Sequence, residues 1–202
     1  MCIRDRACLT RKPSGFGNRV VFSETVIAKM CSVVTDSSRI RAEGLAALTE
    51  GSSRALLVEA YDKILIDESV PPGFERGLDR FIPKADLGPY ALTKFFGHNA
   101  IHATLGFLAR DKGMSYMHEV RESRELLTLA KRAFVEEAGV GLRKEYAEVE
   151  DDLFTPDGFL EYADDALERM INPFLRDPVA RVTRDPIRKL GWEDRMLGSM
   201  RL

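Results

Sequence analysis

The sequence predicts a mainly α-helical domain, and three stretches lead to this prediction. Residues 86–110 are a long run of apolar and small residues whose only proline, Pro89, would fall in the first helical turn. Residues 114–138 place apolar side chains at three- and four-residue spacing, as an amphipathic helix does. A third helical run, 159–171, follows turn residues at 156–158.

The N-terminal third of the chain is harder to assign. Residues 1–18 read as a disordered tail or as sequence foreign to the natural domain, because they are charged and show no periodicity. We take 19–202 as one domain. Within it, 19–34 is expected to begin as a strand and continue as a short helix, and 35–54 to be a loop with some helix. Residues 55–67 are predicted helical, although their large apolar side chains would also suit a strand.

The later elements are bounded by helix breakers. Prolines and a glycine at 71–73 interrupt the chain before the helix at 86–110. Gly139 and Gly141 are expected to loosen or end the helix at 114–138. The helix at 159–171 stops before an Asn-Pro pair, and a short helix is predicted at 176–183.

The composition excludes several classes of protein. Of 202 residues, 45% are hydrophobic and 31% charged, which is ordinary for a globular domain with one sizeable core. Thirty basic and thirty-two acidic side chains leave a formal charge of −2, so a nucleic-acid partner is not expected. No apolar run approaches the roughly 20 residues of a membrane span. Three cysteines without metal-type spacing, and a start lacking a signal peptide, indicate a cytoplasmic protein.

The stretch KFFGHNAIHATLG, residues 94–106, carries polar side chains within an apolar helix. At about 100° per residue, Asn99 lies about 140° and His102 about 80° from Lys94, so the three fit one broad face. An amine, an amide and an imidazole on one face suit carbonyl–alcohol chemistry, because a neutral lysine can accept the hydroxyl proton while an amide stabilises the oxygen. The alternative is structural: a lysine whose charge reaches solvent, and polar groups satisfied by the backbone.

The same stretch raises the possibility of a metal site. His98 and His102 are four residues apart, a spacing that lets two imidazoles share one ion. In HNAIH, however, Asn99 stands where a zinc protease motif has its glutamate, and His118 is the only other histidine. We therefore predict no metal.

A second polar stretch lies near the C-terminus. Six cationic residues fall within twenty positions, interleaved with three aspartates: Arg176, Arg181, Arg184, Arg188, Lys189 and Arg195, with Asp177, Asp185 and Asp194. They could form a solvated network of ion pairs. They could equally form an anion site, because guanidinium groups bind phosphate through two parallel hydrogen bonds.

The chain shows no nucleotide-binding motif. SGFGN at 14–18 contains G-x-G, but Val20 occupies the position of the third glycine in the dinucleotide fingerprint.

At this point the residues resemble a known family. The spacing Lys94-x4-Asn99-x2-His102, followed by Gly106, resembles the catalytic signature of the polyol-specific long-chain dehydrogenases, the mannitol dehydrogenase family. FSETVIAKM (22–30) is similar to the segment that joins that family's two domains. AKRAFVEEAGVGLRKEY (130–146) and ERMINPFLRDPVARVTRDPIRKLGWEDRM (168–196) resemble its mannitol-1-phosphate 5-dehydrogenase branch. The resemblance spans roughly 19–202.

The resemblance implies a helical substrate domain like the C-terminal domain of 6-phosphogluconate dehydrogenase. It also implies metal-independent hydride transfer between NAD and a polyol or polyol phosphate, interconverting mannitol 1-phosphate and fructose 6-phosphate in the closest branch. The catalytic residues would be Lys94 as general base, Asn99 as oxyanion donor and His102 as substrate-oxygen partner. Arg181 and Lys189 match positions that contact the polyol, and Arg184 and Arg188 are candidate phosphate contacts.

The chain departs from the family pattern in two ways. Ala28 and Lys29 replace an acidic–basic pair, and the N-terminal dinucleotide domain is missing, so NAD would be bound mainly by a domain absent from this chain. The chain alone is therefore expected to be inactive. Two alternatives remain: a mannitol 2-dehydrogenase or tagaturonate/fructuronate oxidoreductase, and a non-catalytic helical binding protein. The oligomeric state is not predicted.

Overall fold

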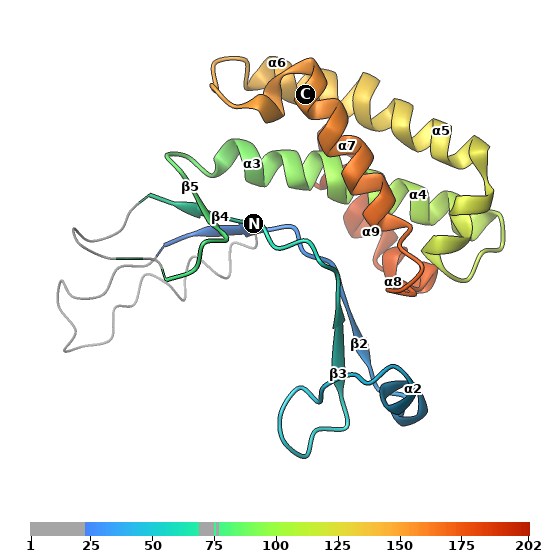
Figure 1. Cartoon of the computed structure of the whole chain (residues 1–202). Coiled ribbons are helices and arrows are strands. Elements are labelled where there is room, and N and C mark those ends of the chain that lie inside the picture. Colours follow the sequence, from blue (N-terminus) through green and yellow to red (C-terminus); the bar gives the residue numbers. More distant parts are fainter. Residues whose placement is uncertain (1–22, 69–74, 76) are drawn as a thin grey trace. The chain divides into compact units, whose positions relative to one another are not determined.

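The structure is a computed structural model that describes residues 23–68, 75 and 77–202. The predicted tail at 1–18 and the SGFGN run lie outside the described residues. The chain divides into two compact units, one comprising residues up to Lys29 together with Tyr61–Ala91, the other Met30–Ala60 with Leu92–Leu202. The predicted mainly α-helical fold class is confirmed (Figure 1).

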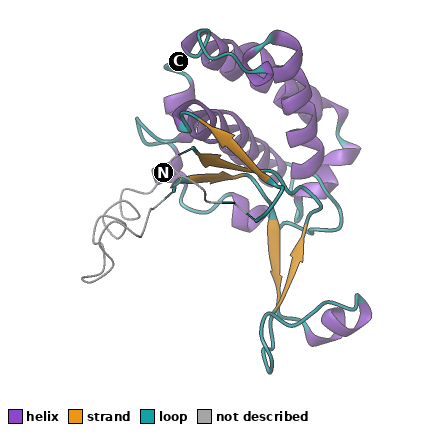
Figure 2. Ribbon diagram, turned by 60° about the vertical axis from the view of Figure 1, so that its left-hand side comes forward, coloured by secondary structure: helices purple, strands orange, loops and turns teal. Residues whose placement is uncertain are grey.

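The first unit contains a small sheet in the order β1 (Thr25–Ile27), β4 (Ile64–Asp67), β5 (Phe81–Lys84) (Figure 2). β1 is antiparallel to β4, and β4 is parallel to β5. The backbone N–H of Glu24, the residue before β1, donates to the carboxylate of Asp67, the last residue of β4, at 2.6 Å.

The prediction of helix at 55–67 was wrong, and the strand alternative is the one observed. β3 (Ala55–Val58) pairs with β2 (Cys31–Val34) in an antiparallel hairpin of the second unit. The hairpin buries Val34 and Ala55 on one face. The short helix expected within 19–34 was wrong for the same reason: cross-strand pairing decides short apolar runs that are compatible with either structure. The expected partial helix in 35–54 is α2 (Ser37–Ala42), capped by Asp36.

The helix predicted at 86–110 is confirmed as three consecutive elements: α3 (Gly88–Leu92), η2 (Thr93–His98) and α4 (Asn99–Asp111). The middle element is a π-helix, which the apolar pattern did not predict. Pro89 lies in the first turn, as expected. 

The helix predicted at 114–138 is interrupted. It consists of a 3₁₀ segment, η3 (Met117–Glu122), followed by α5 (Arg124–Arg132) and a second π segment, η4 (Ala133–Ala138). Ser123 separates the first two by capping α5. The helix then continues past Gly139 as α6 (Gly139–Glu145). A Cβ at Gly139 would lie 2.5 Å from Phe159, so this glycine permits close packing and does not end the helix.

The remaining elements are η5 (Asp152–Phe154), α7 (Pro156–Met170), α8 (Val179–Val182), α9 (Pro186–Lys189) and α10 (Arg195–Ser199). The helix predicted at 159–171 is confirmed as α7. The run predicted at 176–183 is helical only in α8. Within the described part of the chain, no helix is long and apolar enough to cross a membrane.

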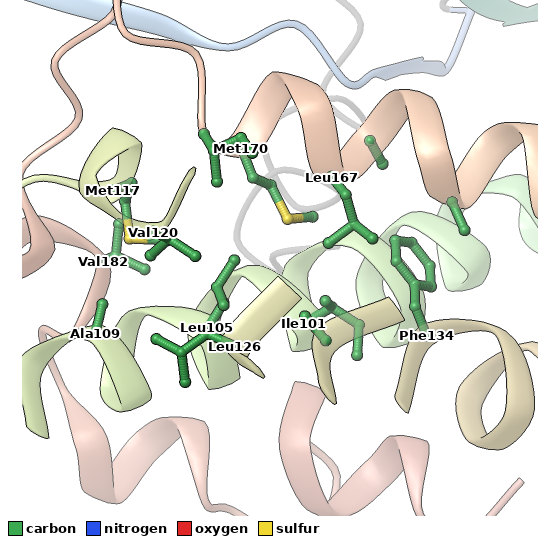
Figure 3. Close-up of a cluster of buried hydrophobic side chains, with 14 of the residues drawn as sticks. Ile101, Leu105, Ala109, Met117, Val120, Leu126, Phe134, Leu167, Met170 and Val182 are labelled. Carbon is green, nitrogen blue, oxygen red and sulfur yellow. The ribbon is translucent and has the colours of Figure 1, made fainter. Parts of the chain in front are cut away.

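The core of the second unit is formed by α4, η3, α5, η4 and α7 (Figure 3). Leu105, Phe134 and Phe159 are fully buried, and the two phenylalanine rings meet nearly edge to face, with centroids 5.9 Å apart. A Cβ at Gly106 would lie 2.5 Å from Val182, so the missing side chain lets α8 pack closely against α4. This contact places the C-terminal cationic segment beside the helix of the KFFGHNAIHATLG stretch.

Candidate active site

Lys94 and Asn99 are related by the π-helical turn. The backbone N–H of Asn99 bonds to the carbonyl of Lys94, five residues earlier. In an α-helix these residues would lie about 140° apart, whereas this bond closes one π turn and stacks them more nearly above one another. His102 follows three residues later in α4, on the neighbouring part of the same face.

The environment of Lys94 shifts its protonation equilibrium toward the neutral form. The side chain is partly buried, and burial lowers its pKa from the ordinary value near 10.5. The direction is the one a lysine base requires, because only the uncharged amine can accept a proton.

His98 is buried and uncharged. Burial is the main cause, with the basic groups of His102, Arg169 and Lys94 adding to it, and the pKa of His98 falls to about 3. Its ring lies 6.2 Å from that of His102, centroid to centroid. Among the residues described, no group of three or more His, Cys, Asp or Glu side chains could hold a metal ion.

The Asp177 carboxylate joins His102 to Arg181. Its Oδ1 accepts from Arg181 Nε at 2.6 Å, and its Oδ2 lies 2.5 Å from Arg181 Nη2 and 3.2 Å from His102 Nε2. Burial raises the pKa of Asp177, but the hydrogen bonds from His102 and Arg181 outweigh it and hold that pKa below the usual range. Sequence reasoning missed this role, although the i,i+4 spacing in DPVAR was a usable signal.

A polar cavity of about 170 Å³ lies next to this group. Its wall consists of residues from α4, α8, α9, α10 and their connections: Asn99, His102, Ala103, Arg181, Val182, Arg184, Asp185, Arg188, Lys189 and Arg195. Six of the seven residues predicted from the sequence therefore surround one cavity. Lys94 is not part of the wall.

The cations of this wall are partly paired. Arg188 lies 3.4 Å from Asp194 and 3.9 Å from Asp185, and Arg184 Nε donates to a backbone carbonyl. Arg195, which belongs to the C-terminal cationic run but was not among the predicted site residues, bonds Asp194 and lies over the Phe95 ring. Five cations nonetheless line the cavity against one carboxylate, that of Asp185. The C-terminal cationic run therefore combines the two arrangements considered from the sequence, because some of its cations form ion pairs and together they give the cavity a cationic wall.

Lys189 has a structural role in addition to its place in the wall. Its buried ammonium group donates to the carbonyl of Val182 at 2.9 Å and to that of Arg184. These bonds close the turn at Asp185, which has a left-handed φ of 53° and precedes the proline that starts α9. Burial lowers the pKa of Lys189, and the positive charges of Arg195, Arg188 and Arg184 lower it further.

A comparison with protein families identifies the chain. The model of the mannitol dehydrogenase C-terminal domain matches residues 86–202, which contain every residue of this cavity. The chain belongs to the mannitol dehydrogenase family.

Its curated relatives in the mannitol dehydrogenase family include mannitol-1-phosphate 5-dehydrogenases. The enzyme of Caldanaerobacter subterraneus subsp. tengcongensis is 34% identical over 117 residues, covering 58% of this chain and 28% of the relative. That of Brevibacillus brevis is 32% identical over 144 residues, covering 71% and 35%. The matched part of the chain therefore spans about a third of the length of these relatives.

Solved structures agree at the level of the fold. Pseudomonas fluorescens mannitol 2-dehydrogenase, in a ternary complex with NAD and D-mannitol, gives a TM-score of 0.60 at 16% identity over 80% of this chain and 31% of that one. A D-sorbitol dehydrogenase in substrate-free form gives 0.62 at 18% identity over 83% and 33%. The mannitol dehydrogenase family match begins at residue 86, so the departure at Ala28 and Lys29 lies outside it.

Proposed function

We propose that this chain provides the substrate-binding and proton-accepting part of an NAD-dependent polyol-phosphate oxidoreductase that interconverts mannitol 1-phosphate and fructose 6-phosphate. The observation that carries the proposal is the cation-lined cavity with Asn99 and His102 in its wall. Membership of the mannitol dehydrogenase family and relatives that are mannitol-1-phosphate 5-dehydrogenases support it.

Lys94 is the general base in this proposal. As the alcohol carbon loses hydride, the neutral amine accepts the hydroxyl proton, and in the reverse direction the ammonium returns it to the carbonyl oxygen. Partial burial supports the role because it lowers the pKa of the amine. Its place one π turn below Asn99 puts it near the residue proposed to bind the same oxygen.

Asn99 and His102 hold the reacting oxygen. The Asn99 amide donates a hydrogen bond that strengthens as negative charge develops on that oxygen, which is the property an oxyanion donor needs. His102, held against Asp177, orients a substrate hydroxyl beside it, and Arg181 contacts the polyol chain.

The phosphate group of the substrate would lie against Arg184 and Arg188, with Lys189 nearby. A phosphate monoester carries about −1.5 to −2 charges at neutral pH, and guanidinium groups bind it through two hydrogen bonds. Five cations against one carboxylate in the cavity wall favour such a dianion over a neutral polyol.

NAD, when bound, supplies the hydride acceptor. The described residues offer no glycine-rich strand–turn–helix unit that fits its pyrophosphate. We therefore assign NAD binding mainly to a domain outside this chain, consistent with matched segments that cover only 28% and 35% of these relatives.

The test is a chimera in which residues 86–202 replace the matching segment of the Brevibacillus brevis enzyme. We expect NADH-dependent reduction of fructose 6-phosphate to exceed that of fructose and tagaturonate by at least tenfold in kcat/KM. Equal turnover, or preference for an unphosphorylated sugar, would refute the phosphate assignment. A folded chimera without turnover on any sugar would favour the non-catalytic alternative.

A further inference from the structure

We propose that Asp177 is a positioning residue whose buried carboxylate holds His102 and Arg181 in place before substrate binds. The inference rests on the proposed function, because that function makes both residues substrate contacts. Asp177 is not in the cavity wall and so would act only through these two side chains.

The Asp177 carboxylate determines which N–H groups of Arg181 remain available to a ligand. The Asp177 side chain is 7% exposed and that of Arg181 is 48% exposed, so the anchor is buried while the guanidinium extends to the surface. Two of the five guanidinium N–H groups are engaged by Asp177, on Nε and Nη2. Three remain, two of them on Nη1. Without Asp177 the long arginine side chain would have to be ordered when the ligand binds, at a cost in affinity.

The same carboxylate sets the tautomer of His102. Its Nε2 is buried and forms no well-aligned hydrogen bond among the described residues, but it lies 3.2 Å from Asp177 Oδ2, an atom that can only accept one. The proton of neutral His102 is therefore expected on Nε2, which leaves the lone pair of Nδ1 to accept from a substrate hydroxyl. An acceptor at His102 Nδ1 would complement the Asn99 amide, which donates a hydrogen bond to the substrate oxygen.

The backbone around Asp177 is held on both sides. Met117 N–H donates to the Asp177 carbonyl, and Val179 N–H donates to the Ser115 carbonyl, each at 2.9 Å. The preceding residue, Arg176, has a left-handed φ of 46°, a costly conformation for a non-glycine residue that persists only where surrounding contacts maintain it. The carboxylate thus has a fixed position, as a positioning residue requires.

The second unit also contains a matched ion pair that does not contribute to the cavity. Glu59 bonds Arg169 through both oxygens, at 3.0 Å to Nε and 2.6 Å to Nη2; the Glu59 side chain is buried and that of Arg169 is 10% exposed. Neither residue lines the cavity. Glu59→Gln therefore removes a buried bidentate pair of the same kind and controls for loss of structural support.

The experiment compares the 202-residue wild-type chain with Asp177→Asn, Asp177→Glu and Glu59→Gln. Calorimetry measures binding of fructose 6-phosphate, and chemical denaturation measures the free energy of unfolding. Long-range proton–nitrogen NMR reads the tautomers of the three histidines, with His102→Gln identifying the signal of His102.

We expect His102 to be protonated on Nε2 in the wild type and in Glu59→Gln. In Asp177→Asn it should become a mixture, because an amide offers one acceptor where the carboxylate offers two. Binding should weaken on the order of tenfold or more in Asp177→Asn while Glu59→Gln binds like the wild type. Should Asp177→Asn fail to fold, Asp177→Glu keeps the charge, moves the carboxylate, and should weaken binding several-fold.

Three results would overturn the proposal: His102 protonated on Nδ1 in the wild type, unchanged tautomer and affinity in both Asp177 variants, or equal loss of affinity in Glu59→Gln. If the wild-type chain binds no fructose 6-phosphate, the proposed substrate is refuted for this chain, and the tautomer measurement still decides whether Asp177 positions His102.

Discussion

Two π-helical segments of the described residues, η2 and η4, share a backbone irregularity and differ in what it does. Each ends with a hydrogen bond across five residues, from Asn99 to Lys94 in η2 and from Gly139 to Phe134 in η4. In η2 the turn joins a partly buried lysine to an amide of the cavity wall. In η4 it directs a phenylalanine into the core.

The difference shows that a π-helical turn is not by itself a sign of function. Such turns are frequent at functional sites, but here the side chains decide. The two segments also contact each other, because a Cβ at Gly97 in η2 would lie 2.9 Å from the Phe134 ring. Phe134 of η4 thus supports the backbone of η2 at Gly97. Variants in the two segments should therefore have different effects, on turnover in η2 and on stability in η4.

The largest expected effect comes from Lys94→Ala in the chimera. Removing a general base should lower kcat by about 10²- to 10⁴-fold. Unfolding free energy should change little, because burial disfavours the charged amine in the first place. Lys112→Ala, which removes an exposed lysine paired with Glu125, is the control and should keep full turnover. Retained activity in Lys94→Ala would remove Lys94 as the base.

The counterpart in η4 is Phe134→Ala. Its ring is fully buried, and truncation should cost about 3–5 kcal/mol of unfolding free energy, measured by chemical denaturation. Phe174→Ala, at a phenylalanine that is 77% exposed, should cost far less. Because Phe134 packs against Gly97, some activity of the chimera should be lost as well. A stability loss no larger than that of Phe174→Ala would contradict the assignment of η4 to the core.

The smallest effect concerns His98, the last residue of η2. Its pKa is about 3 in the folded chain against about 6.5 when unfolded, so the unfolded state binds the proton first as pH falls. Stability from this group is complete above pH 6.5 and is lost as pH decreases toward 3. Between about pH 7 and pH 4.5 the loss should be on the order of 2–3 kcal/mol, at about 1.4 kcal/mol per unit.

This pH range distinguishes His98 from Asp177. Because the pKa of Asp177 is lowered, the stability that Asp177 contributes is lost only at more acid pH. Denaturation of wild type and His98→Gln across this range is the measurement. The variant should lack this part of the pH dependence. An identical slope in both proteins would show that His98 is not held neutral.

The long helices could be predicted from the sequence, whereas at 55–67 the sequence left both helix and strand open and the helix was the wrong choice. Residues 86–110 are a long run of apolar and small residues and 159–171 are a helical run after a turn, so each is long enough for local sequence to indicate a helix. Residues 55–58 and 64–67 are short apolar runs, and only their pairing with distant strands made them β structure. The interruption of the 114–138 helix at Ser123 was missed because the apolar spacing continues across this residue, while its side chain caps the start of α5.

The sequence by itself determined which residue types meet at the candidate site. The spacing of Lys94, Asn99 and His102 and the cationic run from Arg181 to Arg188 are local features, and helix geometry follows from local spacing. Only the tertiary structure decided that the cationic run lies beside Asn99 and His102, and that Asp177 connects Arg181 to His102. These contacts depend on the packing of α8 against α4 at Gly106, between segments more than seventy residues apart, where local pattern carries no information about distance.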